Sequence, residues 1–421
     1  MRETMQVVFG PAVHRIQNSV KTRQDLCGVL TAFVPFALVL GRAFADIAVS
    51  IVAIFFLIEC IERRQWGWVR KPWVVVALLL WIYGLSRSLF VPHLDGIRTS
   101  LFWVRYIVFA ASAATWILPQ PKWRLWTARS AMAAVLFLSI DSLVQYIFRF
   151  DVIGHPLYDG NRLTSVYKTP TDGITIANLY GAAIFWLLAR KQVRDASVLA
   201  VLCFLAVFLS GDRMGLVLAV AIMLVWLFFL LRGNRKLWLP VAALGVLMFV
   251  ALLVFAPARI QRQFESTSHI VEHIWHSPYG LAWKSAIDVG EAHPVFGVGI
   301  HQFRYVCPDP RYGPLIDPLS GHPRCYTHPH NAYLEWFAET GAVGLAGYVL
   351  LVLVMAAGLV RRVWANAGDP LLWGLATMLA MRLAPFYVST SFFNNWSAIP
   401  FWLFFAWAMT YSPTALRRAA A

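Results

Sequence analysis

Histidines, arginines, glycines and carboxylates crowd together in one stretch of this chain, between residues 291 and 348. Near the end of that stretch, in THPHNAYLEWFAETG, Pro329 cannot continue a helix, so we expect a long apolar helix to begin near His330 or Asn331, with Asn331 as its N-cap. His330 would then stand where irregular, polar chain meets a membrane helix. A histidine in such a place can serve as a general base, because its unperturbed pKa lies close to operating pH.

Other side chains around His330 allow different interpretations. Glu335 and Glu339 follow Asn331 at i+4 and i+8, on one face of the expected helix, and we interpret them and His328 as supporting residues. One alternative is a structural histidine that satisfies loop carbonyls. Another is a metal site built on His328 and His330, whose spacing is weak without a further ligand. We predict a catalytic base and no metal.

A base of this kind needs a charged substrate held beside it, and two arginines are candidates for holding one. Arg213, in FLSGDRMGL, lies between two apolar runs that leave almost no loop, so it needs a partner at the membrane surface. The simplest partner is the adjacent Asp212. The functional alternative is an anion, because the guanidinium fork matches phosphate oxygens. Arg162, in DGNRLTSVYKTP with Lys168 nearby, is either a second anion contact or a solvated loop charge.

The composition places these residues in a membrane protein. The 421 residues are 59% hydrophobic and only 14% charged, with a mean hydropathy of +0.62. Runs of about 18 or more apolar residues recur, which is the length that crosses a bilayer. The net charge of +15 is then expected in cytoplasmic flanks and at sites for anionic head groups. We exclude nucleic acid as a partner, since no soluble basic face remains to bind it.

We predict an all-α polytopic protein with about twelve transmembrane helices. The expected spans are 27–41, 43–61, 72–88, 100–118, 130–148, 173–189, 196–211, 214–231, 237–256, 331–359, 370–389 and 395–412. With both termini inside, each inside connection is basic, as the orientation rule requires; examples are Arg63, Arg70, Lys122, Arg190, Arg235 and Arg361. The predicted organisation is 1–256 with nine helices, a periplasmic loop or cap at 257–330, and 331–421 with three helices and a cytoplasmic tail.

The long outside loop has features of its own. Cys307 and Cys325 both lie in it, and in an oxidising compartment they form a plausible disulfide clamp on a proline-rich segment. Arg259, Arg262 and Lys284 add basic charge there. Within the spans, Arg105 and Arg382 are expected to face the bundle interior, where Asp46 and Asp141 can neutralise them.

Two segments together carry a family resemblance: WKSAIDVGEAHPVFGVGIHQF and THPHNAYLEWFAETGAVGLAGY. They resemble the signature of the O-antigen ligase and polymerase superfamily of membrane glycosyltransferases, over about 70 residues. The resemblance implies that His330 is the essential histidine, Arg213 an essential arginine and, less directly, Arg162 another. The family often has an arginine four residues before the loop tryptophan, whereas here Tyr279 precedes Trp283; Arg259, Arg262 or Lys284 is the expected substitute.

The resemblance implies a function on the periplasmic face of a bacterial inner membrane. The expected donor is a glycan on undecaprenyl pyrophosphate, and the expected acceptor is the lipid A–core oligosaccharide, with no cofactor and no metal. Polymerase and protein oligosaccharyltransferase activities are alternatives within the superfamily, and the short C-terminal tail argues against the latter. A lipid-linked-glycan flippase is the alternative from another class; it would gather charges such as Arg105, Asp141 and Arg382 in a midplane cavity.

Overall fold

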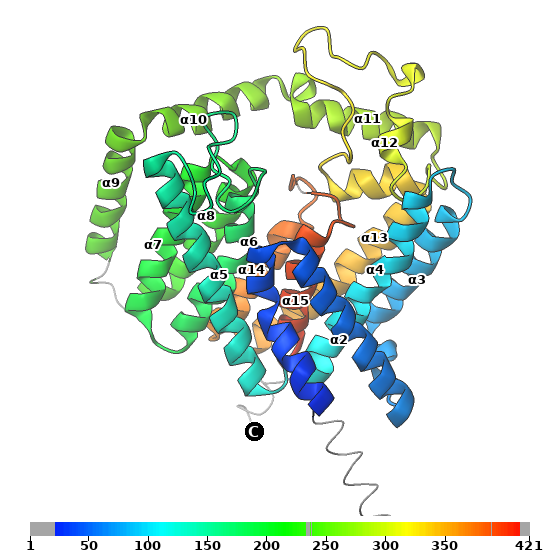
Figure 1. The fold of residues 1–421 in the computed structure, drawn as a ribbon, viewed down its shortest axis with the longest axis horizontal. Coiled ribbons are helices and arrows are strands. Elements are labelled where there is room, and N and C mark those ends of the chain that lie inside the picture. Colours follow the sequence, from blue (N-terminus) through cyan, green and yellow to red (C-terminus); the bar gives the residue numbers. More distant parts are fainter. Residues whose placement is uncertain (1–21, 233–235, 237, 389, 413–421) are drawn as a thin grey trace, which may run out of the picture.

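The computed structural model describes residues 22–232, 236, 238–388 and 390–412, and in this part of the chain it consists of helices and connecting loops (Figure 1). Eight helices there are long and apolar enough to cross a membrane. The prediction of an all-α polytopic membrane protein is therefore confirmed. The helices that coincide with the expected spans are Thr22–Leu40, α2 (Arg42–Arg63), α3 (Pro72–Ser88), α4 (Leu94–Ser112), α5 (Pro121–Phe148), α6 (Asp172–Ala189), α7 (Val193–Ser210), α8 (Arg213–Leu231), α9 (Trp238–Phe255), α13 (Ala332–Ala365), α14 (Pro370–Leu383) and α15 (Asn395–Met409).

Several helix boundaries differ from the expected spans; α4 and α5, for example, begin at Leu94 and Pro121 rather than at residues 100 and 130. α14 ends at Leu383 rather than near residue 389, because Pro385 disfavours helical backbone at the residue before it, and Ala384 is extended. The residues that follow, 384–388 and 390–394, are irregular; they are called segment 384–394 and return in the site described below. α13 continues to Ala365 and carries a non-helical break at Gly341.

The helices form two groups joined by a buried one. α6 packs on α5, α7, α8 and α14, whereas α13 packs on α3, and α3 and α2 pack on α4. α15 contacts members of both groups, and its residues from Ser397 to Met409 are all buried. Because α15 is apolar on every side, it is stable only where other helices enclose it.

A cap covers one end of the bundle. α10 (Pro257–Glu272) follows α9 and runs across the ends of the upright helices, and α11 (Pro278–Ala292) continues it towards α13 (Figure 1). After the short α12 (Phe303–Val306), the segment 307–325 is closed by a disulfide between Cys307 and Cys325. The buried guanidinium of Arg324 donates to the carbonyls of Cys307 and Tyr312, at 2.8 and 2.7 Å, and holds this segment on itself.

A turn from the cap inserts into the break in α13. The amides of Val298 and Gly299 donate to the carbonyls of Ala338 and Glu339, at 3.1 and 2.7 Å. Gly341 has a φ of 67°, and a β-carbon on it would lie 2.3 Å from the Val295 backbone. Only glycine allows this conformation and this approach of two backbones. The glycines of the GVG turn and of the ETG sequence thus serve one docking contact.

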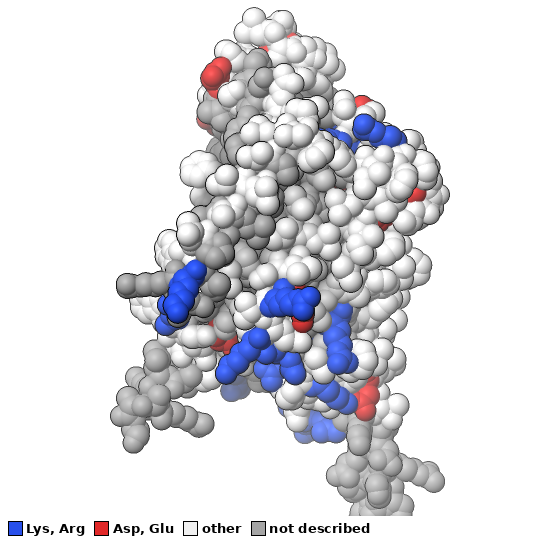
Figure 2. All heavy atoms as spheres, turned by 90° about the vertical axis from the view of Figure 1, so that its left-hand side faces the viewer, with Lys and Arg blue, Asp and Glu red and all other residues white. Residues whose placement is uncertain are grey.

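Charged side chains are unevenly distributed over the surface. On the face drawn in Figure 2, lysines and arginines gather at the lower end, and a broad band above them carries few charges. This pattern fits a helical bundle whose connections at one end are basic and whose middle faces lipid.

Candidate active site

His330 lies where the cap enters α13, with its ring packed among three others. The ring centroids of Tyr279 and Tyr326 each lie 5.7 Å from that of His330, close to edge-on. The His328 ring lies 4.2 Å away. The φ of His330 is 56°, in the left-handed region that few residues other than glycine adopt. Such a conformation persists only where the surroundings impose it, and it is frequent at active sites.

The residue after His330 fixes the helix start. The Asn331 side-chain oxygen accepts from the amides of Tyr333 and Leu334, at 2.9 and 3.1 Å, so Asn331 is the N-cap of α13, as its position predicts. Its amide nitrogen also donates to the Pro385 carbonyl at 2.7 Å. Asn331 therefore joins the start of α13 to segment 384–394.

Two buried carboxylates on α13 hold the neighbouring loops. Glu335 accepts from the Phe392 amide at 2.8 Å. Glu339 accepts from the His301 amide at 2.7 Å and from the Phe303 amide at 3.4 Å. The two glutamates that follow Asn331 thus position segment 384–394 and the cap turn, and neither touches the His330 ring through these bonds.

Tyr279 connects His330 to the two arginines. Its phenol is buried, which raises its pKa; the negative charge of Asp212 adds to that effect, and the charges of Arg213 and Arg162 oppose it. Tyr279 therefore lies within electrostatic range of both arginines and packs against the His330 ring. Residues from four distant parts of the chain meet here: the 149–171 loop, the start of α8, the start of α11 and the start of α13.

The adjacent carboxylate does not account for Arg213. The Asp212 side chain caps α8, accepting from the Gly215 amide at 3.0 Å. No ion pair joins it to Arg213 within the described residues. The Nε atoms of Arg213 and Arg162 are both buried and have no hydrogen-bond partner in the described part of the chain. Buried donors of this kind normally have an acceptor, so the pair is suited to an anion.

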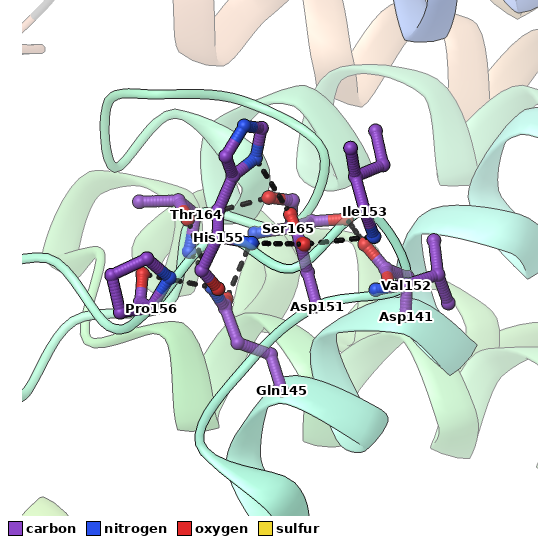
Figure 3. A network of polar contacts seen from close by, with 9 residues as sticks. All are labelled: Asp141, Gln145, Asp151, Val152, Ile153, His155, Pro156, Thr164 and Ser165. Carbon is purple, nitrogen blue, oxygen red and sulfur yellow. Dashed lines mark hydrogen bonds and ion pairs between the residues drawn. The ribbon is translucent and has the colours of Figure 1, made fainter.

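A polar network fixes the loop that carries Arg162 (Figure 3). The side chain of Gln145, on α5, accepts from the amides of Thr164 and Ser165 at 2.8 and 3.0 Å, and donates to the Thr164 hydroxyl at 3.0 Å. Asp141, one turn earlier, accepts from the Ser165 hydroxyl and from the Val152 amide. Both α5 side chains are buried. Their hydrogen bonds hold this irregular loop in place and so set the position of Arg162.

Other predicted residues lie elsewhere. The Arg259 guanidinium is buried over the Tyr146 ring, 5.9 Å from its centroid, at the junction of α10 and α5. Lys284 is exposed on α11 and lies near Asp288, one turn on. Lys168 is exposed on the 149–171 loop. The Arg262 side chain lies outside the described residues.

One of the two expected pairings of intramembrane charges forms, and the other does not. Arg105 and Asp46 form the expected ion pair, at 2.8 Å. Asp141 does not neutralise Arg382, because its oxygens serve the 149–171 loop. Arg382 instead donates to Asn178 at 3.4 Å and lies over the Tyr387 ring.

Three tyrosines of the site were not assigned from the sequence. Tyr279 was recognised only as a departure from the family pattern, yet its ring packs against that of His330, as the Tyr326 ring also does. Tyr387, in segment 384–394, is buried with a hydroxyl that has no partner in the described part of the chain; burial raises its pKa to about 12, and the charge of Arg382 partly opposes this. Its electrostatic contact with Asp212 places it on the same side of the site. No sequence signal distinguishes Tyr387 from other tyrosines.

A metal site on His328 and His330 would need at least one further ligand. Among the described residues, no group of three or more histidine, cysteine or carboxylate side chains could hold a metal ion. The His328 and His330 rings pack against each other at a tilt of 57°, beside the two tyrosines.

The fold and site together define a polytopic helical membrane protein with a capped site at one end of the bundle. Residues 198–349 match the family model described as O-Antigen ligase. The match confirms the resemblance to the O-antigen ligase and polymerase superfamily, and it supports a glycosyltransferase-type activity on lipid-linked glycans. Arg213, Tyr279 and His330 fall within the matched residues, and Arg162 precedes them. No curated protein matches the chain.

Proposed function

We propose that this protein is an O-antigen ligase, which moves a glycan from undecaprenyl pyrophosphate to the lipid A–core oligosaccharide on the periplasmic face of the inner membrane. The observation that carries the proposal is the meeting of His330, through Tyr279, with two arginines whose buried Nε atoms have no partner among the described residues. A base beside an anion site is what this transfer requires. The proposed topology has both termini in the cytoplasm.

The reaction joins the acceptor hydroxyl oxygen to the anomeric carbon of the donor sugar and breaks the bond from that carbon to the pyrophosphate oxygen. His330 takes the hydroxyl proton, and the lipid pyrophosphate leaves with the electron pair. Arg213 and Arg162 stabilise the charge that develops on it, and because this charge grows towards the transition state, the contact accelerates the reaction. In-line attack inverts the anomeric configuration. No step uses a metal.

The flippase alternative predicts a midplane cavity lined by charges. The intramembrane charges are instead satisfied locally, Arg105 by Asp46 and Arg382 by Asn178 and Tyr387. The site residues gather under the cap, which favours surface chemistry over passage through the bundle. Polymerase and oligosaccharyltransferase activities share this chemistry and differ in the acceptor.

The acceptor that the protein uses therefore distinguishes a ligase from a polymerase and from an oligosaccharyltransferase. Purified protein is given the lipid-linked glycan together with lipid A–core, with a second lipid-linked repeat, or with an acceptor protein, and the products are separated by gel electrophoresis. Ligase activity predicts a shifted lipid A–core band alone. A lengthened lipid-linked glycan would instead identify a polymerase, and glycosylated protein would identify an oligosaccharyltransferase.

A further inference from the structure

We infer that a basic cavity next to the candidate active site binds the acceptor glycan through phosphate groups that the glycan carries. This inference rests on the proposed function and deepens it. The cavity has a volume of about 460 Å³, and its lining includes Arg42, Arg98, Arg105, His301, Arg304 and His328. Those residues come from the starts of α2 and α4, from the cap turn with α12, and from the loop before α13. The volume lies in the range of small-molecule sites.

The charge of the cavity wall is strongly positive. Four arginines line it, and no carboxylate does. Arg105 is already neutralised, because its guanidinium donates to both oxygens of Asp46 at 2.8 and 3.0 Å. Arg42, Arg98 and Arg304 remain as cations. Asp95, which is bonded to the Tyr305 hydroxyl at 2.5 Å, interacts electrostatically with Arg98 and Arg304. Glu335 and Glu339 interact with Arg304, and none of these three carboxylates lines the cavity.

Arg304 is held in position by a neutral histidine. Its Nη2 donates to Nε2 of His301 at 2.6 Å. Burial, together with the charge of Arg304, lowers the pKa of His301 to about 4. The His301 ring therefore accepts this bond at neutral pH without adding charge. The Nε of Arg304 is buried with no partner among the described residues. A fixed guanidinium with an unused donor is suited to a phosphate or carboxylate oxygen.

The cavity extends to His328, which packs against the candidate base. His328 lines it, and the His328 ring lies 4.2 Å from that of His330. The arginines that we assign to the donor, Arg162 and Arg213, do not line it. Two separate cationic sites thus flank the histidine pair, as a transfer between two anionic substrates requires. Phe102, Trp103 and Phe393 in the wall provide aromatic surface against which sugar rings can pack.

The test compares acceptors that differ only in phosphate. Full-length protein in phosphatidylcholine nanodiscs receives saturating lipid-linked donor and a titration of lipid A–core, either intact or treated to remove its phosphates. We expect Arg42→Gln and Arg98→Gln each to raise the KM for the intact acceptor by about 5-fold, with the donor KM unchanged. With the dephosphorylated acceptor, the variants and the wild type should have the same KM. Arg311→Gln, at an exposed arginine of the cap outside the cavity, is the matched control and should change neither.

Equal effects on both acceptor forms, or no effect on either, would overturn the inference. A membrane phospholipid is the other source of phosphate, and it is tested by adding phosphatidylglycerol to the nanodiscs. If Arg98→Gln changes the response to this lipid but leaves the KM for the intact acceptor unchanged, then the lipid occupies the cavity and the inference is wrong.

Binding separates this inference from the proposed function. If the wild type transfers nothing to lipid A–core, the proposed function fails. Binding of intact lipid A–core to the His330→Ala protein then decides the inference alone. Weaker binding after the additional Arg98→Gln substitution supports it, and unchanged binding refutes it.

Discussion

The backbone of His330 has a left-handed conformation between the buried Pro329 and Asn331, the N-cap residue of α13. Its ring therefore has a fixed place beside Tyr279. We predict that His330→Ala and His330→Gln each lose on the order of 10²–10⁴-fold in transfer rate, because neither side chain can accept the hydroxyl proton. Donor binding should persist, since the arginines provide it. Single-turnover assays and donor titration measure the two effects.

The corresponding His328→Ala substitution is the control and should cost much less. If both histidine variants failed alike and added divalent metal restored the wild-type rate after chelation, the general-base assignment would be wrong.

Arg213 begins α8, and its buried Nε has no partner among the described residues. We predict that Arg213→Ala abolishes transfer while leaving the protein folded, because no internal ion pair is broken. Arg213→Lys should recover only part of the rate, since a point charge replaces a two-donor fork. Arg311→Gln again serves as the control. Full activity of the alanine variant would refute an anion site at this position.

His301 gives the fold a pH dependence. Its pKa is about 4 in the folded protein, against an ordinary value of 6.5, so the unfolded chain binds its proton first as the pH falls. The contribution of His301 to the free energy of unfolding is complete above about pH 6.5 and is lost progressively towards pH 4. The loss amounts to about 2 kcal/mol after allowance for the partial exposure of the ring. His301→Asn, which tolerates the positive φ, should flatten this part of the profile of unfolding temperature against pH. An unchanged profile would assign the acid sensitivity to other groups.

At the scale of elements, the break in α13 is the contact that brings the cap to the bundle. We predict that Gly341→Ala costs about 2–4 kcal/mol, because a β-carbon there would strain the backbone and meet Val295. Transfer should fall with stability, since Glu339 and the cap turn shift together. Gly358→Ala, in the same helix with ordinary contacts at its β-carbon, should be neutral or slightly stabilising. Thermal unfolding of both variants in detergent is the measurement, and equal stability would contradict the docking role.

The helices themselves could be read from the sequence, and much of the site could not. Apolar runs and prolines predicted the spans, because length and periodicity are local signals. His330, Arg213 and Asn331 followed from local chemistry and from resemblance. The contact of Tyr279 with His330, the role of Tyr387 and the separation of Arg259 from the site depend on how distant segments pack. Spacing along the chain carries no such information.

At the scale of the whole molecule, the proposed topology places the 149–171 loop and the cap on one side of the membrane and the connection between α6 and α7 on the other. A cysteine at Asn161 should therefore react with an impermeant thiol reagent in intact spheroplasts, and one at Arg194 only after permeabilisation. The other cysteines give little background, because Cys27, Cys60 and Cys203 are buried and the remaining two are paired. Labelling of both positions from the same side would contradict the topology.

The basic cavity and the arginine pair are built from different segments, and the loop that carries His328 and His330 borders both. The cavity is lined by residues of α2, α4, the cap turn, that loop and segment 384–394, whereas Arg162 and Arg213 come from the 149–171 loop and α8. Recognition of the receiving molecule can therefore diverge among relatives without disturbing the machinery that releases the lipid carrier. Chimaeras that receive residues 42–106 and the cap turn from a relative should acquire the acceptor preference of that relative and keep their own donor preference.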